Sequence, residues 1–223
     1  MRVEAIEATT ADGIRLRGEL VRGDSTWCVL VHDEGEDIDS WRPLRRGLAR
    51  LGWTVLAMDL RGHGGSDGMW NRARGALDVD LPVTLAWRSG ASHVCLFGAG
   101  LGGLLALEAT ERALAEPSFA LADSLVLVSP GPLGDADPMT LRGQGLAKLV
   151  IVGARDPGRP DAASLIGASI GWTLDVTFGT ELRGSALVEA FAENVLDKVG
   201  SFLREQVALR GPGASRVEGV ARR

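Results

Sequence analysis

The stretch VCLFGAGLGG, residues Val94–Gly103, decides how this chain folds and which chemistry it can support. An apolar run leads straight into a glycine turn, and a leucine-rich segment with helical character follows. The glycines fit G-x-G-x-x-G, the turn that holds a dinucleotide pyrophosphate at a helix N-terminus. They also fit G-x-S-x-G, the strand–turn–helix that exposes a nucleophilic serine, with Gly100 in the serine position. The rest of the chain has to distinguish the two interpretations.

Hydrophobic patterns upstream of the turn predict strands and one helix. Three strands are expected within residues 1–31, and the last of them, WCVLVH, has the continuous apolar character of a strand covered on both faces. Helical spacing of large apolar residues predicts a helix over about 41–51, and WTVLAMDL is typical of another buried strand. The polar, arginine-bearing segment 71–90 is expected to be a connection.

Downstream of the turn the alternation continues. A helix is expected from Leu101 to about Glu116, strands are expected in SLVLVSP, AKLVIVGARDP and TLDVTFG, and residues 185–207 have the pattern of one amphipathic helix. Strands that alternate with helices predict a mostly parallel sheet covered on both faces. Residues 1–207 are expected to form one domain. Residues 208–223 carry four arginines against one glutamate and are expected to be a flexible basic tail.

The composition limits which binding partners and which cellular compartment fit this chain. A net charge of −5 lacks the basic excess that a nucleic-acid-binding face needs. No apolar run is long enough to cross a membrane, and the N-terminus lacks the basic and apolar regions of a secretory signal. Cys28 and Cys95 lie in apolar runs, as expected of buried thiols in a reducing compartment. We expect a cytoplasmic protein that binds neither nucleic acid nor membrane, with no oligomeric state indicated.

The dinucleotide interpretation meets two obstacles. That fold places its glycine turn after the first strand, and an acidic residue about 20 residues further on, at the end of the next strand, binds the ribose. Here four or five strands are expected before the turn, and the next strand ends in VSPG, residues 128–131, without a carboxylate. A dinucleotide site built on GAGLGG stays an alternative, but no cofactor is expected.

Four further segments favour the nucleophile turn. VLVHDEGEDIDSW resembles the strand and His-Gly loop that carry part of the oxyanion hole in α/β-hydrolases, and MDLRGHGGSDG resembles the loop after the following strand. LVIVGARDP resembles the strand that delivers the acid of the catalytic triad, and FGTELRGSAL resembles the loop that delivers its histidine. The similarity covers about residues 3–207, in the family's order. It implies a compact α/β-hydrolase fold: an about eight-stranded, mostly parallel sheet with helices on both faces and no cap domain.

The same resemblance assigns the catalytic positions, and two of the three residues are missing. The nucleophile position is Gly100, which has no side chain. The acid position is Asp156, which is retained, and the histidine position is Arg183. No histidine follows residue 93, so a shifted alignment does not restore one, and a guanidinium stays protonated and cannot act as a base. Loss of a triad costs on the order of 10⁶ in turnover, so ordinary ester hydrolysis is not expected.

What the resemblance leaves is a pocket able to bind anions. The backbone N–H groups of Leu101 and Glu34 would form the oxyanion hole, with His32 beside them as a further ligand-binding candidate. Glycine adopts the strained geometry of the turn at little cost, which suits a position that has lost its nucleophile. Asp156 and Arg183 are expected to form an ion pair in place of the Asp–His hydrogen bond.

An acidic loop, DEGEDID over residues 33–39, follows the strand that ends at His32. Several carboxylates could hold a hard divalent cation, but their order is not that of an EF-hand loop. Solvation at the surface is the simpler interpretation, so no metal is expected. Asp33 stands where the family has glycine. Carboxylates at this point oppose a developing negative charge, which again disfavours acyl transfer.

These observations predict a non-hydrolytic pseudo-enzyme of the α/β-hydrolase fold that binds a small acyl or carboxylate ligand, or a protein partner. One alternative is an enzyme of the family with altered chemistry, such as a lyase, an isomerase or a residual esterase. His32, His63, Asp156 or Arg183 would then take new roles. The other alternative is the dinucleotide binder.

Overall fold

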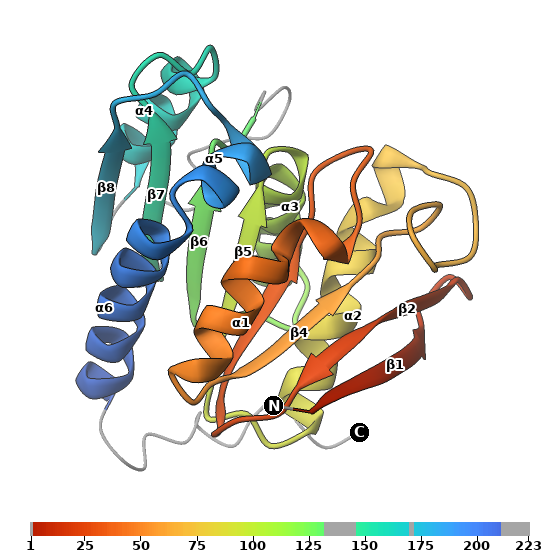
Figure 1. The fold of residues 1–223 in the computed structure, drawn as a ribbon. Coiled ribbons are helices and arrows are strands. Elements are labelled where there is room, and N and C mark those ends of the chain that lie inside the picture. Colours follow the sequence, from red (N-terminus) through yellow and green to blue (C-terminus); the bar gives the residue numbers. More distant parts are fainter. Residues whose placement is uncertain (1, 132–145, 170–171, 211–223) are drawn as a thin grey trace.

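A computed structural model describes residues 2–131, 146–169 and 172–210 (Figure 1). Its centre is one eight-stranded sheet with the strand order β1-β2-β4-β3-β5-β6-β7-β8. The β1–β2 and β2–β4 pairs are antiparallel and the other pairs are parallel, so the mostly parallel sheet expected from the sequence is confirmed. The strands are β1 (Val3–Thr9), β2 (Arg15–Val21), β3 (Thr26–Val31), β4 (Thr54–Met58), β5 (His93–Ala99), β6 (Ser124–Val128), β7 (Ala147–Gly153) and β8 (Thr173–Phe178).

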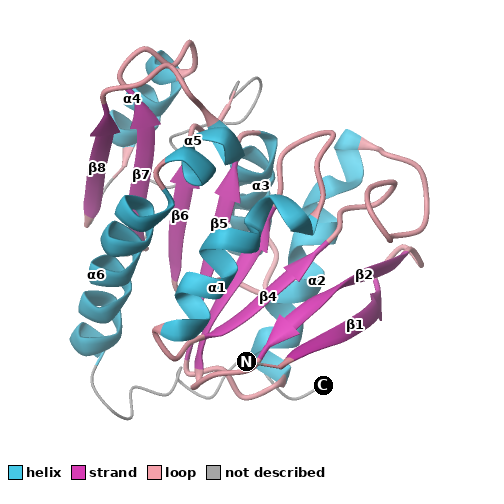
Figure 2. Cartoon of the chain, viewed as in Figure 1, coloured by secondary structure: helices cyan, strands magenta, loops and turns pink. Residues whose placement is uncertain are grey.

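Helices cover both faces of the sheet (Figure 2). One face is covered by α2 (Gly75–Arg88), α3 (Leu101–Ala115) and α4 (Arg159–Ala168). The other is covered by α1 (Arg42–Arg50), α5 (Gly184–Ala190) and α6 (Ala192–Arg210). Two short 3₁₀ helices, η1 (Ile38–Trp41) and η2 (Arg72–Arg74), precede α1 and α2. Within the described ranges, no helix is both long enough and apolar enough to span a membrane.

The alternation of side chains along β5 explains why two core clusters form. Every residue of this strand is buried. Val94 and Leu96 point into the cluster under α2 and α3, whereas Cys95 and Phe97 point into the cluster under α1 and α6. A strand covered on both faces has to be apolar throughout, which is the pattern that the sequence has.

Both cysteines are free and buried, as their apolar surroundings predict. They occupy paired positions on the neighbouring strands β3 and β5. Burial raises the pKa of the Cys95 thiol to about 12 and also raises the pKa of Cys28 well above its usual value. Neither thiol is therefore an available nucleophile at neutral pH.

The structure differs from the sequence expectation in the helices. Residues 75–88, expected to be a connection, form α2 despite Pro82 in its interior, because residues such as Leu77, Val79 and Val83 are buried against the sheet. The C-terminal helix is divided into α5 and α6 at Phe191, and α6 extends three residues beyond the expected end, to Arg210. The remaining part of the expected basic tail, residues 211–223, lies outside the described residues.

A buried ion cluster fixes the loop that follows β4. The side chain of Arg61 lies 2.7 Å from Asp78 on α2 and 2.8 Å from Asp12 in the β1–β2 connection. Its backbone N–H also donates to Asp78. Breaking a buried pair of this kind leaves an uncompensated charge, so the cluster holds the loop after β4 against α2 and the β1–β2 connection.

Candidate functional site

The glycine turn at the end of β5 keeps the geometry of a nucleophile elbow. Gly100, at φ 53° and ψ −121°, joins β5 to α3 in a region that residues with side chains rarely adopt. An ideal Cβ on Gly98 would lie 2.3 Å from the carbonyl oxygen of Gly102, and one on Gly102 would lie 2.3 Å from that of Val31. The flanking glycines are therefore accounted for by the close approach of α3 to β3 and β5, without a dinucleotide.

The carboxylate of Asp33 lies where a side chain on Gly100 would be. An ideal Cβ on Gly100 would lie only 1.8 Å from Asp33 Oδ2. The other oxygen, Oδ1, accepts hydrogen bonds from the backbone N–H groups of Leu101 at 2.7 Å and of Glu34 at 2.8 Å. These are the two donors that the resemblance assigns to the oxyanion hole. The site thus contains an anion supplied by the chain itself, on its two preorganised N–H groups.

Arg183 and the first two residues of α5, Gly184 and Ser185, each lie against a different carboxylate. Arg183 Nε lies 3.8 Å from Asp156 Oδ1, so the ion pair expected from the sequence is present. An ideal Cβ on Gly184, at φ 53°, would lie 2.8 Å from Asp33 Oδ2. The hydroxyl of Ser185 donates to Glu36. The segment 183–185 therefore connects the acid position to the acidic loop.

Asp156 follows β7 and is held by the local chain. Its Oδ1 accepts a hydrogen bond from the Gly158 N–H at 2.8 Å, and its side chain is fully buried. The Arg183 side chain is 43% exposed and also donates to the carbonyl of Gly131. An ion pair with one exposed partner is screened by water and contributes little stability.

The two histidines near the turn are bound to the backbone through both ring nitrogens. His32 Nδ1 donates to the Asp33 carbonyl, and Nε2 accepts from the Leu60 N–H. His63 Nδ1 likewise donates to the Arg61 carbonyl, and Nε2 accepts from the Gly35 N–H. Each ring therefore has backbone hydrogen bonds at both nitrogens. Neither histidine can transfer a proton without breaking a backbone hydrogen bond, so both are structural.

The buried His32 makes stability depend on pH. Burial lowers the pKa of His32 below its ordinary value of 6.5, so the unfolded chain takes up the proton first as the pH falls. Stability is therefore expected to fall below about pH 6.5. In urea denaturation at about pH 7.5 and about pH 5.5, the wild type should lose more stability than His32→Gln, which has no imidazole to protonate. An equal loss in both proteins would contradict this assignment.

The acidic loop has structural partners for its carboxylates. Glu34 accepts from the Trp70 indole N–H at 2.9 Å, and Asp37 accepts from the Asp39 N–H to cap η1. Asp39 pairs with Arg42 at 2.7 Å. Surface solvation was therefore an incomplete interpretation of this loop. Among the described residues, no group of three or more histidines, cysteines, aspartates or glutamates is arranged to hold a metal ion.

The structure brings together Gly100, Leu101, Glu34, Asp156 and Arg183. His32, in contrast, is buried and bonded to backbone groups of Asp33 and Leu60. Sequence reasoning missed the role of Asp33. The signal was present: an aspartate in the family's glycine position, in a chain with glycine in the serine position. It also missed Ser129 at the end of β6.

Ser129 is the one non-glycine residue with a positive φ, 48°, in the described part of the chain. Its buried hydroxyl has no hydrogen-bond partner there. Such strain persists only where the surrounding structure imposes it, and it often marks functional sites.

Comparisons with known proteins agree with this architecture. The model of the alpha/beta hydrolase family matches residues 28–219, and the chain belongs to that family. No curated protein matches the chain by sequence. An esterase of Pyrococcus furiosus shares 20% identity with a TM-score of 0.74, and the alignment covers 92% of each chain.

Two other solved structures have the same fold. Est1E from Butyrivibrio proteoclasticus, with ferulic acid bound, shares 15% identity over 91% of this chain and 99% of that chain, with a TM-score of 0.75. An enol-lactonase from Burkholderia xenovorans shares 16% identity over 89% of this chain and 100% of that chain, with a TM-score of 0.70. Identities this low establish the fold alone.

Proposed function

We propose that this chain is a non-hydrolytic member of the family that binds a small ligand at its residual active site. The observation that carries the proposal is the position of Asp33. Its carboxylate lies where the nucleophile's side chain would be and accepts hydrogen bonds from both oxyanion-hole donors. A substrate carbonyl could reach those donors only by displacing a charged group that they already bind.

The chain lacks both the hydroxyl nucleophile and the histidine base that acyl transfer uses in this family. Gly100 has no hydroxyl to attack a carbonyl, and Arg183 has no free base to take up a proton. His32 and His63 are hydrogen-bonded to the backbone, and the buried His93 lies 2.9 Å from the Ser124 hydroxyl. A tetrahedral intermediate would also develop negative charge beside the Asp33 carboxylate, which opposes it.

A residual esterase is the second candidate, because the solved structures of this fold include esterases. The two candidate functions differ in one respect: an esterase forms a covalent acyl intermediate on a serine, and a non-hydrolytic protein does not. Under our proposal, the purified full chain forms no adduct with a fluorophosphonate probe, and its hydrolysis of p-nitrophenyl acetate equals that of the heat-denatured chain. Mass spectrometry of the intact protein measures the adduct directly. A stoichiometric adduct on one serine would overturn the proposal in favour of an esterase.

A further inference from the structure

A cavity of about 80 Å³ lies between α2 and the sheet, and we call it the hairpin cavity because the β1–β2 hairpin forms one of its walls. The helix α2 packs mainly on β3, β4 and β5, whereas β1 and β2 are the outermost strands at that end of the sheet, so the helix leaves a hollow beside them. The lining consists of five apolar residues and two polar ones: Ile6, Leu20, Trp27, Leu56, Leu85, Arg22 and Ser89.

The walls of the hairpin cavity favour an apolar occupant. Leu20, Trp27 and Leu56 are buried in the core, and Ile6 and Leu85 pack against the same core. Water is held poorly by such walls, because an ordered water needs about two to four polar partners. An engineered apolar cavity of about 150 Å³ binds benzene, which has six carbons. The hairpin cavity has about half that volume and therefore suits a group of about three carbons.

Arg22 brings accessible donors to the rim of the hairpin cavity. Its Nε donates to both carboxylate oxygens of Glu4 on β1, at 3.1 and 3.3 Å. Its two Nη groups donate to none of the residues that the structure describes, and the side chain is 59% exposed. A guanidinium with both Nη groups available matches the two oxygens of a carboxylate.

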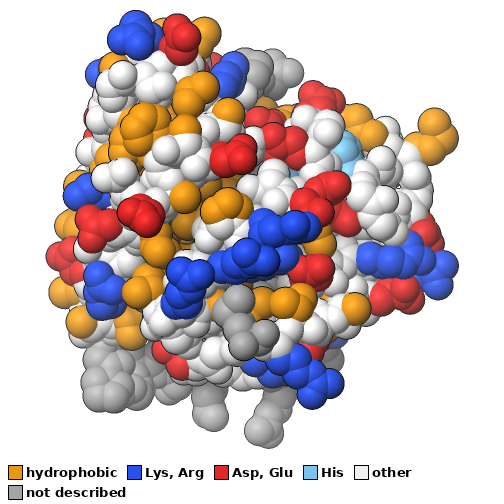
Figure 3. All heavy atoms as spheres, viewed as in Figure 1, with side chains coloured by type: hydrophobic (Ala, Val, Ile, Leu, Met, Phe, Trp, Pro, Cys, Tyr) orange, Lys and Arg blue, Asp and Glu red, His pale blue; other side chains and the backbone are white. Residues whose placement is uncertain are grey.

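The ion pair with Glu4 leaves room for a second carboxylate. Ion pairs between exposed side chains are screened by water and contribute little free energy, so Glu4 does not saturate the guanidinium of Arg22. Acidic and basic side chains lie next to one another over the β1–β2 hairpin (Figure 3), where Arg17 pairs with Glu7 as Arg22 pairs with Glu4. The rim is therefore not surrounded by uncompensated negative charge.

The end of α2 also favours a ligand that accepts hydrogen bonds. The carbonyl groups of residues 85–87 already accept from the backbone N–H groups of residues 89–91, so the helix end presents few free acceptors. The exposed hydroxyl of Ser89 makes no hydrogen bond with any described residue. It lies in the same cavity lining as Arg22 and supplies a further donor.

We propose that the hairpin cavity binds a short-chain monocarboxylate. The carboxylate accepts from the Arg22 guanidinium and the Ser89 hydroxyl, and an alkyl group of about three carbons lies among the apolar walls. None of the lining residues belongs to the residual active site, so this second site is independent of the proposed function.

The test compares butyrate with two probes on the full chain. Acetate keeps the carboxylate without the chain, and 1-butanol keeps the chain without the charge. In two-dimensional NMR titrations, butyrate should shift the indole N–H signal of Trp27 and the amide signal of Ser89. Its Kd should be lower than that of either other probe on the order of tenfold, since acetate buries about two fewer methylene groups and 1-butanol loses a charge-assisted hydrogen bond.

Two variants test the two parts of the hairpin cavity. Arg22→Gln removes the guanidinium and should raise the Kd for butyrate on the order of tenfold. Arg22→Lys keeps the charge without the planar fork and should recover only part of that affinity. Ile6→Phe places a larger side chain in the wall and should raise the Kd for butyrate on the order of tenfold while leaving that for acetate within about twofold.

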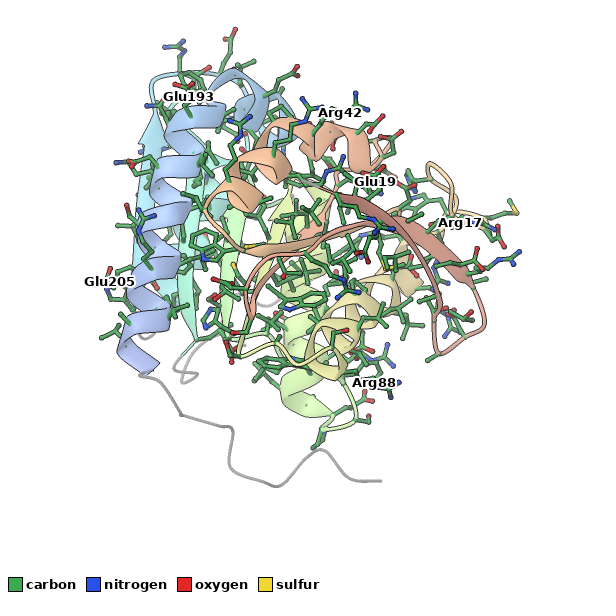
Figure 4. All side chains as sticks on the ribbon, turned by 60° about the horizontal axis from the view of Figure 1, so that its bottom comes forward. Arg17, Glu19, Arg42, Arg88, Glu193 and Glu205 are labelled. Carbon is green, nitrogen blue, oxygen red and sulfur yellow. The ribbon has the colours of Figure 1, made fainter. Side chains whose placement is uncertain are left out.

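Arg42→Gln is the matched control. Arg42 is 53% exposed and pairs with one carboxylate, that of Asp39, as Arg22 pairs with Glu4. It lies on α1, on the opposite face of the sheet from Arg88 at the end of α2 (Figure 4). Its effect on the Kd for butyrate should stay below about twofold. Thermal unfolding of each variant establishes that it is folded, and Arg22→Gln decides the question if Ile6→Phe does not fold.

Three results would overturn the inference. They are 1-butanol binding as tightly as butyrate, Arg22→Gln behaving like Arg42→Gln, and butyrate shifting the amide signals of Leu101 and Gly184 but not the Trp27 indole signal. The last result would place butyrate in the residual active site. A fluorophosphonate adduct, in contrast, would defeat the proposed function and leave the hairpin cavity as a binding site.

Discussion

Replacing Gly100 with serine should destabilise this protein by about 2–4 kcal/mol and should not create an esterase. The new Cβ would lie 1.8 Å from Asp33 Oδ2, and φ would remain at 53°. Overpacking typically costs about 1–3 kcal/mol, and a side chain in a strained backbone region costs a similar amount. If the Asp33 carboxylate moved aside, it would lose its hydrogen bonds to Leu101 and Glu34. Urea denaturation measures the loss.

Two further variants separate collision from backbone strain. Gly90 also has a positive φ, 87°, but a Cβ there would have no atom within 4 Å, so Gly90→Ser measures the strain alone. Combining Gly100→Ser with Asp33→Ala removes the collision and should give a favourable coupling of about 1–2 kcal/mol in a double-mutant cycle. If the two effects add, the Asp33 carboxylate does not occupy the space where a side chain on residue 100 would be.

The second large effect is a gain of activity. The triple variant Gly100→Ser, Asp33→Gly and Arg183→His should hydrolyse p-nitrophenyl acetate at least on the order of 10³-fold faster than the wild type and should react with a fluorophosphonate at the introduced serine. It restores the nucleophile, empties the oxyanion hole, and places an imidazole beside Asp156, where Arg183 now lies 3.8 Å away.

The most informative comparison omits only the change at Asp33. Gly100→Ser with Arg183→His supplies both reactive groups but leaves the carboxylate on the oxyanion donors, so it should stay near the wild-type rate. Adding Asp156→Asn to the triple variant should remove most of the gain, because the imidazole then loses its orienting carboxylate. Equal activity with and without Asp33 would mean that this carboxylate does not block the site.

The fold followed from the sequence because its signals are local. The apolar runs of β3, β5, β6 and β7 are buried on both faces, and the glycines at 98 and 102 permit the close packing of α3. The sequence did not predict α2, because Pro82 and the polar residues of this segment obscure its helical pattern. The face that α2 buries can be identified only when the sheet against which it packs is known. The division of the expected C-terminal helix into α5 and α6 at Phe191 was not predicted either, because tertiary packing decides where a helix ends.

The site was partly predictable for the same reason. The backbone donors of Leu101 and Glu34 and the Asp156–Arg183 ion pair follow from aligned motifs. The position of the Asp33 side chain does not, because it depends on the space left by two glycines at positions 100 and 184, far apart in the sequence. The hydrogen bonds of His32 and His63 are likewise three-dimensional facts, and they remove both residues from the catalytic candidates.

Steric exclusion at the glycine turn couples positions 33 and 100. A side chain at position 100 and the carboxylate of Asp33 cannot occupy the same space, so each position limits which residue the other can hold. Substitutions at the two positions are therefore epistatic, and a side chain at position 100 is compatible with this backbone only where residue 33 is smaller or turned away.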